Sequence, residues 1–162
     1  RYQEFGVVYV YRVMFESSSG PRFVYKTGKT KVALNCRDQE SVNNALKRAA
    51  RKRALSYSHN VIHRASSVDL VFYYICSSED AAFRLEQRIL NRTRSLGVEH
   101  YAEYQQFIHT KRRLREYRVP EGNARFDFFT YIRDAEHDSE VEQFEDLTSS
   151  PLRLISSPSA SA

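Results

Sequence analysis

Glu86 is the carboxylate in this sequence that is best placed to do chemistry. Three apolar residues of the stretch AAFRLEQRIL recur at helical spacing and form one stripe beside it: Ala82, Leu85 and Ile89. A carboxylate on an apolar face costs free energy unless it is paired or binds a metal. We therefore expect Glu86 to face inward, either as a metal ligand or in a salt bridge with Arg37 or Arg84. Four arginines of the same segment take other sides and are expected to be free for phosphate contacts: Arg84, Arg88, Arg92 and Arg94.

Gly28 follows a strand-like segment and has two interpretations. In the first, the missing Cβ lets backbone N–H groups approach a phosphate closely at the end of a strand. In the second, the glycine is there only because a turn requires its backbone conformation. The string GKTK does not complete a P-loop, because Phe23 stands where that motif needs its first glycine. A nucleoside triphosphate site is therefore excluded.

Basic residues dominate the first part of the chain. The 162 residues include 25 Lys and Arg and 20 Asp and Glu, and up to Arg118 there are 22 basic and 11 acidic residues. A net charge of +11 predicts nucleic acid as the partner, DNA in preference to RNA, although a merely solvated basic surface is the alternative. Eight residues in two basic runs are the candidate phosphate contacts: Lys47, Arg48, Arg51, Lys52, Arg53, Lys111, Arg112 and Arg113.

Other functional classes find no support in the sequence. The longest apolar run, residues 68–76, is far shorter than the roughly 20 residues that cross a bilayer, so no membrane partner is expected. No signal peptide opens the chain, and we expect an intracellular (nuclear or cytoplasmic) or virion location. Cys36 and Cys76 are expected to be reduced core thiols, and the five histidines show no zinc-ligand spacing.

The elements that must position these residues follow from the pattern of residue types. Segments 6–15 and 23–27 are rich in β-branched and aromatic residues, which predicts an antiparallel hairpin with a loop longer than two residues. Segment 68–75 reads as a buried central strand. Helices are expected over 41–57 and from Ser78 to Leu96, ending at Gly97. A further helix is expected over 101–118, and segment 126–132 fits either a strand or a helix.

Two strings, GVVYVYRV and VYKTGKT, occur in the order that resembles the GIY-YIG nuclease superfamily. The resemblance is closest to its viral and phage branch, whose second motif reads like YKIGKT, and it covers residues 6–97. Tyr9 falls on the first motif's tyrosine, which in that family assists deprotonation of the attacking water. Gly28 falls on the glycine of the second motif and Lys26 on its tyrosine. A charged lysine cannot be a base and can only neutralise phosphate, and Thr27 replaces an aliphatic residue of the pattern.

The resemblance also implies roles for two residues outside these strings. Arg37 matches the arginine that stabilises charge on the scissile phosphate in the transition state. Glu86 matches the helix glutamate that holds a single Mg²⁺ or Mn²⁺, with water and phosphate at the remaining positions. The implied function is an endonuclease that cleaves phosphodiester bonds with one divalent metal.

We expect an α+β fold with a small three-stranded antiparallel sheet flanked by helices. Residues 1–97 would form the nuclease-type domain, residues 98–133 an aromatic and basic helical extension, and residues 134–162 an acidic and then Ser/Pro-rich tail. The alternative function is a catalytically inactive nucleic-acid-binding or assembly protein, for example of a virus, which keeps the scaffold. In that case the tail would dock on a protein partner.

Overall fold

The structure is a computed structural model of the chain, and it describes residues 2–35, 41–60, 65–108 and 111–156. For residues 2, 35, 57–60 and 111–113 it describes the backbone alone. Arg37 and Cys36 therefore lie outside the described residues. The end of the predicted tail, residues 157–162, also lies outside them.

A long hairpin forms the centre of the molecule. Strands β1 (Tyr2–Ser17) and β2 (Gly20–Asn35) pair antiparallel along their whole length, from Tyr2 opposite Asn35 to Ser17 opposite Gly20. The predicted hairpin is confirmed, but the prediction of a long loop is wrong. The strands continue to a two-residue turn because Gly20 adopts a positive φ of 104°, which permits the tight reversal.

The sheet has six antiparallel strands within the described residues, so the expected α+β class is confirmed and the expected three strands are wrong. β3 (Ala65–Cys76) pairs with the other side of β1, and the path through the sheet runs β4-β2-β1-β3-β5. β5 (Val141–Asp146) and β6 (Leu152–Ser156) both pair with β3, although they come from the segment read as a tail. Along the edge of β3 that faces away from β1, backbone N–H and C=O groups would otherwise lack hydrogen-bond partners. The two short strands β5 and β6 provide these partners.

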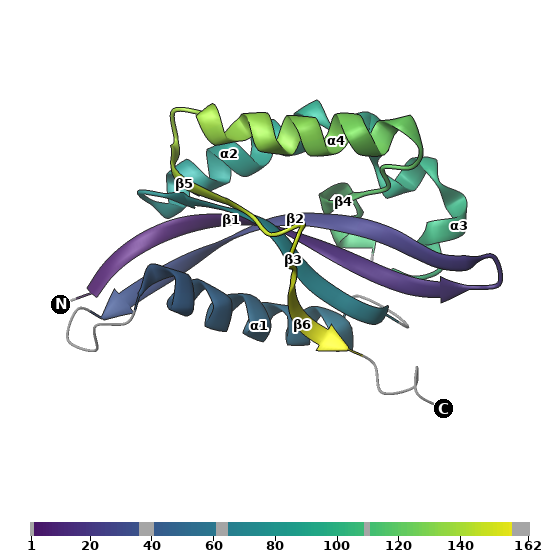
Figure 1. The fold of residues 1–162 in the computed structure, drawn as a ribbon, viewed down its shortest axis with the longest axis horizontal. Helices are drawn as coiled ribbons and strands as arrows, with labels where there is room; N and C mark the ends of the chain where they lie inside the picture. The colour runs from purple at the N-terminus through teal and green to yellow at the C-terminus, as the bar shows by residue number, and fades with distance from the viewer. Residues whose placement is uncertain (1, 36–40, 61–64, 109–110, 157–162) are drawn as a thin grey trace.

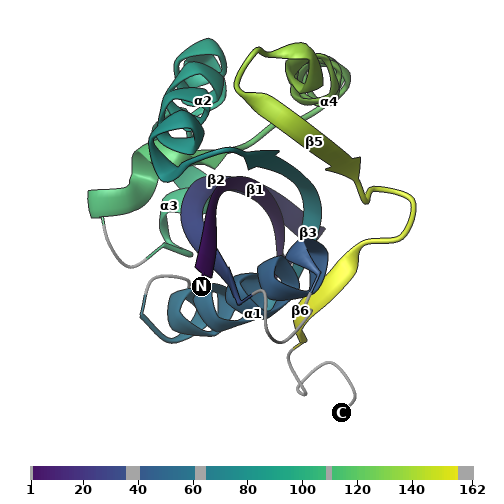
Figure 2. The same ribbon diagram turned by 90° about the vertical axis from the view of Figure 1, so that its left-hand side faces the viewer.

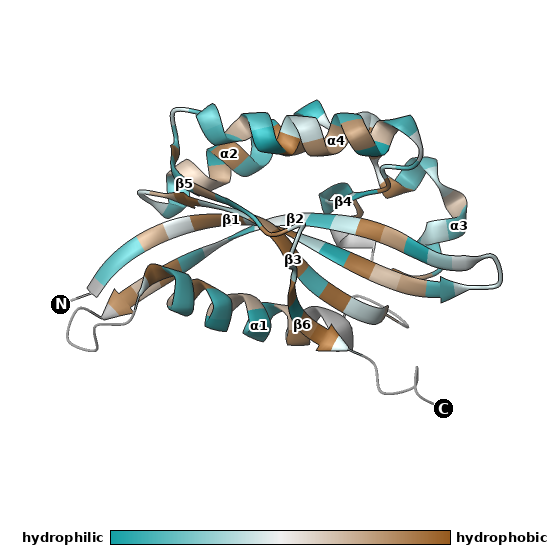
Figure 3. Cartoon of the chain, viewed as in Figure 1, coloured by the Kyte–Doolittle hydropathy of each residue, from teal (hydrophilic) through white to brown (hydrophobic). Residues whose placement is uncertain are grey.

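Helices cover both faces of the sheet (Figures 1 and 2). α1 (Val42–Asn60) packs on one face, and α2 (Glu79–Arg92) and α4 (Asn123–Asp134) pack on the other. α1 buries its small apolar residues against the sheet, and its ribbon is largely hydrophilic elsewhere (Figure 3). Segment 126–132, for which the sequence left two choices, is therefore helical.

α2 begins as the sequence predicts and ends earlier. The Ser78 hydroxyl accepts a hydrogen bond from the Ala81 amide, and Glu79 and Asp80 occupy the positive end of the helix dipole. The helix ends at Arg92, and a separate 3₁₀ turn, η1 (Arg94–Leu96), precedes Gly97.

The predicted helix over 101–118 is wrong. The chain instead forms η2 (Val98–His100), the one-turn α3 (Ala102–Gln105), η3 (Lys111–Glu116) and the short strand β4 (Tyr117–Arg118), and η4 (Ala135–His137) follows α4. Tyr104 and Phe107 are buried against the hairpin, and Phe107 stacks on Phe15 with ring centroids 4.5 Å apart. Docking of these aromatic residues onto the sheet outweighs the local helical preference.

Candidate active site at the edge of the sheet

Five of the residues singled out from the sequence line one small pocket. Its volume is about 200 Å³, and it lies beside β2. Residues from five elements form its walls: Tyr9, Lys26, Gly28, Lys29, Arg53, Phe83, Glu86, Arg115 and Glu116. Tyr9, Lys26, Gly28 and Glu86 were identified from the sequence, and Arg53 belongs to the predicted basic face of α1. Sequence reasoning missed Lys29, Phe83, Arg115 and Glu116.

The pocket lies at this edge because β2 is only partly covered there. β4 pairs with Tyr25 and Lys26, and within the described residues no strand continues along β2 beyond that point. In Figure 2, α2 and α1 lie on opposite faces of the sheet, and the segment around α3 lies between them at one side. Side chains from both faces, Glu86 from α2 and Arg53 from α1, therefore reach the same open edge.

Gly28 makes room for the phenol of Tyr9. The two residues are directly opposite each other in the hairpin, and Gly28 lies inside β2 rather than at its end. A Cβ atom built on Gly28 would lie 2.6 Å from Tyr9 Oη and 2.8 Å from Lys26 Nζ. The expectation that this glycine stands at a strand end is therefore wrong. Any larger residue at position 28 would clash with the Tyr9 phenol, which occupies the space beside Gly28.

Tyr9 is 1% exposed and belongs to the core on the α1 face, although it also lines the pocket. Its ring stacks on Tyr11 with a centroid separation of 4.5 Å. Lys26 Nζ donates a hydrogen bond of 3.5 Å to Tyr9 Oη. Packing thus fixes the ring and leaves the phenolic oxygen beside the charged groups of the pocket.

Lys26 is a fully buried cation at the centre of this group. Its ammonium lies 3.5 Å from Glu116 Oε2 and 5.2 Å from the centroid of the Tyr9 ring. An ammonium removed from water requires such partners, because its loss of hydration is otherwise uncompensated. Lys26 therefore connects the phenol of the first strand to a carboxylate of η3.

Glu86 is buried, at 4% exposure, as its place beside the apolar stripe predicts. Burial raises the pKa of its carboxyl group, and the charge of Glu116 raises it further, while a hydrogen bond from Gln87 and the charges of Lys26 and Arg115 act in the opposite direction. Gln87 Nε2 donates to Glu86 Oε1 at 3.0 Å. The carboxylate is thus held in place at a cost in solvation.

Two exposed arginines of α2 form ion pairs with acidic residues. Arg84 Nε lies 2.8 Å from Glu140 Oε1, and Arg88 forms two hydrogen bonds with Asp138. Arg84 is therefore engaged by Glu140, and the predicted freedom of Arg84 and Arg88 to contact phosphate is wrong. The acidic segment after α4 folds back onto α2 and supplies these carboxylates. The other predicted partner of Glu86, Arg37, lies outside the described residues.

The two carboxylates of the pocket suit a hard divalent cation. Glu116 Oε2 is buried and accepts no hydrogen bond from the described residues, apart from its ion pair with Lys26. Mg²⁺ and Mn²⁺ bind through one or two carboxylates and keep water or phosphate as further ligands. The described residues contain no cluster of three or more His, Cys, Asp and Glu side chains. Glu86 and Glu116 are the carboxylates of this pocket that could serve as such ligands.

The predicted basic residues have different positions relative to the pocket. Five on α1 are exposed, and Arg53 among them lines the pocket: Lys47, Arg48, Arg51, Lys52 and Arg53. The side chains of Lys111, Arg112 and Arg113 lie outside the described part of the structure. Arg115, two residues further, does line the pocket.

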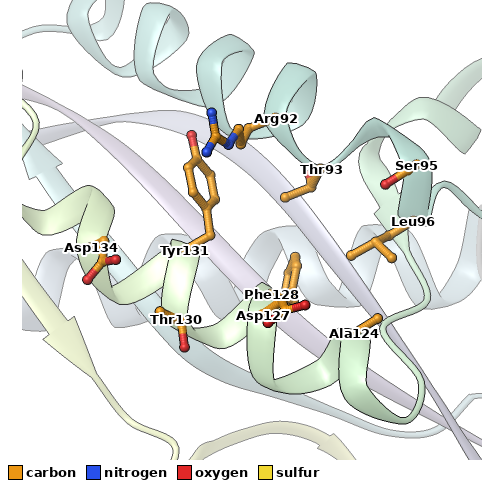
Figure 4. Close-up of a pocket in the computed structure, with 10 residues that line it drawn as sticks. All are labelled: Arg92, Thr93, Ser95, Leu96, Ala124, Asp127, Phe128, Thr130, Tyr131 and Asp134. Atoms are coloured by element: carbon orange, nitrogen blue, oxygen red, sulfur yellow. The ribbon is translucent and has the colours of Figure 1, made fainter.

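A larger cavity, of about 470 Å³, lies between the end of α2 and α4 (Figure 4). The Arg92 guanidinium lies 5.6 Å from the centroid of the Tyr131 ring there. The acidic residues of its wall, Asp127 and Asp134, are exposed on α4. Arg92 is the one residue singled out from the sequence that lines this cavity, and none of the candidate catalytic residues does, so the residue types rather than the volume distinguish the pocket at β2.

No helix in the described segments is both long and apolar enough to cross a lipid bilayer. Cys76 is buried at the end of β3, and burial raises the pKa of its thiol to about 11, which leaves it unreactive as a nucleophile near neutral pH. Comparison of the chain with protein-family models, with curated proteins and with solved structures finds no match.

Proposed function

We propose that this protein is a metal-dependent endonuclease of the GIY-YIG type, and that the pocket beside β2 binds the phosphodiester to be cleaved. One observation carries the proposal. The buried Glu86 carboxylate and the Tyr9 phenol, 77 residues apart in the sequence, meet in one pocket with four basic side chains at its wall: Lys26, Lys29, Arg53 and Arg115.

The chain's own residues supply most of the parts that phosphodiester cleavage needs. Glu86 and Glu116 would hold Mg²⁺ or Mn²⁺, which when bound supplies Lewis-acid stabilisation of the charge on the phosphate. Tyr9 Oη lies at the pocket, where in its phenolate form it would orient the attacking water and accept its proton. Arg53 and Arg115 would bind the non-bridging oxygens through charge-assisted hydrogen bonds. The role of Arg37 in the transition state stays a prediction.

Lys26 favours a second candidate, a nucleic-acid-binding or assembly protein that does not cleave. Its ammonium lies within 3.5 Å of both Tyr9 Oη and Glu116 Oε2, where it neutralises a carboxylate without any metal. A cation fixed there competes with a divalent ion for Glu116. In this case the basic wall binds phosphate, and hydrolysis is slow or does not occur.

Nicking of supercoiled plasmid DNA in Mg²⁺ or Mn²⁺ tests the proposal. We expect the parent protein to nick the plasmid and Glu86→Gln to abolish nicking. Glu142→Gln, at an exposed position of β5, is the matched control and should behave as the parent. Binding without nicking by the parent supports the second candidate, and a gain of nicking in Lys26→Tyr would identify Lys26 as the cause. A parent protein that neither binds nor nicks DNA contradicts both.

A further inference from the structure

Phe83 is a large apolar side chain that the fold does not use as core. It lies on α2, three residues before Glu86, and is 46% exposed. The apolar residues that attach α2 to the sheet are different ones, and all are buried: Ala81, Ala82, Leu85, Ile89 and Leu90. Packing therefore does not explain a phenylalanine at this position. Its location does suggest a role, because the ring lines the pocket that contains Glu86.

The side chains around the Phe83 ring suit a ligand that carries both negative charge and an aromatic ring. Lys29 Nζ lies 5.9 Å from the centroid of the Phe83 ring, and its ion pair with Glu79, at 3.1 Å, ties it to the same helix. Arg53 and Arg115 belong to the same wall. An exposed aromatic face among cationic side chains is how proteins bind unpaired nucleotides, since the base stacks while the cations contact its phosphates.

The size of the pocket determines which part of a nucleotide enters. A volume of about 200 Å³ admits a phosphate group and its immediate ligands, but not a sugar and base in addition. The base next to a phosphate in the pocket must therefore lie at the rim, where Phe83 is exposed. In a duplex that base is already stacked between its neighbours and is not available to a flat side chain.

We propose that Phe83 is a stacking platform for the nucleobase adjacent to the bound phosphate, and that the substrate is therefore a single-stranded or locally unpaired segment of nucleic acid. This inference rests on the proposed function, because it assumes that the pocket binds a backbone phosphate. It adds the substrate class and a specificity-determining residue.

Affinity for a labelled single-stranded oligothymidine and for a blunt duplex, measured by fluorescence anisotropy in Ca²⁺, tests the inference. We expect the parent to prefer the single strand. Phe83→Ala should weaken single-strand binding about 5- to 150-fold, the range for removal of one base–aromatic stack. Phe83→Tyr should retain parent affinity, and duplex binding should not change.

Phe126→Ala is the matched control, because Phe126 is 73% exposed on α4 and lines none of the pockets described above. The inference is overturned if Phe83→Ala behaves like Phe126→Ala, or if it weakens single-strand and duplex binding equally. The nicking assay separates the two proposals. Loss of nicking in Glu86→Gln with no effect of Phe83→Ala on binding overturns the stacking role alone. Single-strand binding that depends on Phe83, without nicking by the parent, overturns the endonuclease alone.

Discussion

At the scale of single residues, Glu86 carries a charge where the protein solvates it poorly. Burial raises the pKa of its carboxyl group above the ordinary value, so the folded protein binds this proton more tightly than the unfolded chain does. The resulting stabilisation is complete below the ordinary carboxyl pKa and is lost as the pH rises through the raised folded-state pKa. The charged form of Glu86 therefore gives a lower free energy of unfolding than the protonated form.

Glu86→Gln should accordingly raise the free energy of unfolding at pH 7, because burying a neutral amide costs less desolvation than burying a carboxylate. The amide oxygen of the new residue can still accept the hydrogen bond from Gln87. Thermal melting from pH 4 to pH 8 checks this, and the gain should shrink toward the acidic end. A destabilised variant at pH 7 would show that attraction to Lys26 and Arg115 exceeds the desolvation cost.

Gly28→Ala should impair both the site and the fold. The new methyl group would lie 2.6 Å from Tyr9 Oη and 2.8 Å from Lys26 Nζ, two buried side chains that packing holds in place, so the free energy of unfolding should fall by about 1–3 kcal/mol. Nicking or phosphate binding should fall by about tenfold or more, because the phenol is displaced. Gly6→Ala should cost more stability, because its Cβ would lie 1.9 Å from the backbone oxygen of Ser78, and a backbone atom cannot move away without distorting the fold. Equal stability losses in the two variants would contradict this account.

Thr27 stands where the GIY-YIG motif has an aliphatic residue, and it is buried as that residue would be. The side chain is fully buried, and its hydroxyl has no hydrogen-bond partner among the described residues. Thr27→Val keeps the shape and removes a buried unsatisfied group, so it should stabilise the protein by about 1 kcal/mol. Chemical denaturation measures this change. A loss of stability would indicate that the hydroxyl is hydrogen bonded in solution.

At the scale of elements, α1 presents a basic face opposite the face that it buries. Reversing the charge of Arg51, Lys52 and Arg53 should weaken binding to any DNA sequence alike. It should also reduce the slope of log K against log salt by about 0.7–0.9 for each phosphate that the variant no longer neutralises. Substituting Arg84 and Arg88 with alanine is the control, because these arginines already contact Glu140 and Asp138. An unchanged slope in the α1 variant would exclude this face as the phosphate-binding surface.

The strands β5 and β6 show how an element can depend on the surface that receives it. In neither strand do buried and exposed positions alternate regularly, and both strands pair with β3. Val141 and Phe144 of β5 pack on the core beneath α2 and α4, whereas Leu152 and Ile155 of β6 pack on the core beneath α1. The two short strands therefore extend both cores from a single edge.

At the scale of the whole molecule, the acidic C-terminal part neutralises the outer face of α2. Arg84 and Arg88 are thereby paired, whereas the basic residues of α1 are exposed. The double variant Asp138→Asn, Glu140→Gln should release Arg88 and Arg84 and raise affinity for nucleic acid several-fold at low salt. The free energy of unfolding should change little, since both ion pairs are largely exposed to solvent. Filter binding with Glu142→Gln as the control measures this, and unchanged affinity would mean that nucleic acid does not approach this side.

Local patterns were sufficient for the elements whose signals lie close together in the chain. The hairpin, α1, the start of α2 and the buried strand β3 follow from strand-forming residues, helical spacing and the cap at Ser78. Segment 101–118 and the end of the chain could not be predicted in this way. Tyr104 and Phe107 bury themselves against the hairpin, and β5 and β6 exist because β3 offers an open edge.

The sequence by itself determined that Glu86 would be buried, because its place beside an apolar stripe is a property of one helix. Only the tertiary structure decided that this carboxylate meets Tyr9, Lys26 and Gly28. That meeting requires α2 to pack across β1 and β2, and it brought in Arg115 and Glu116, which follow the basic run at 111–113 but were not themselves predicted to reach this site. The physical reason is the range of the interactions: periodicity and capping act over a few residues, whereas the pocket depends on how faces formed far apart in the chain pack together.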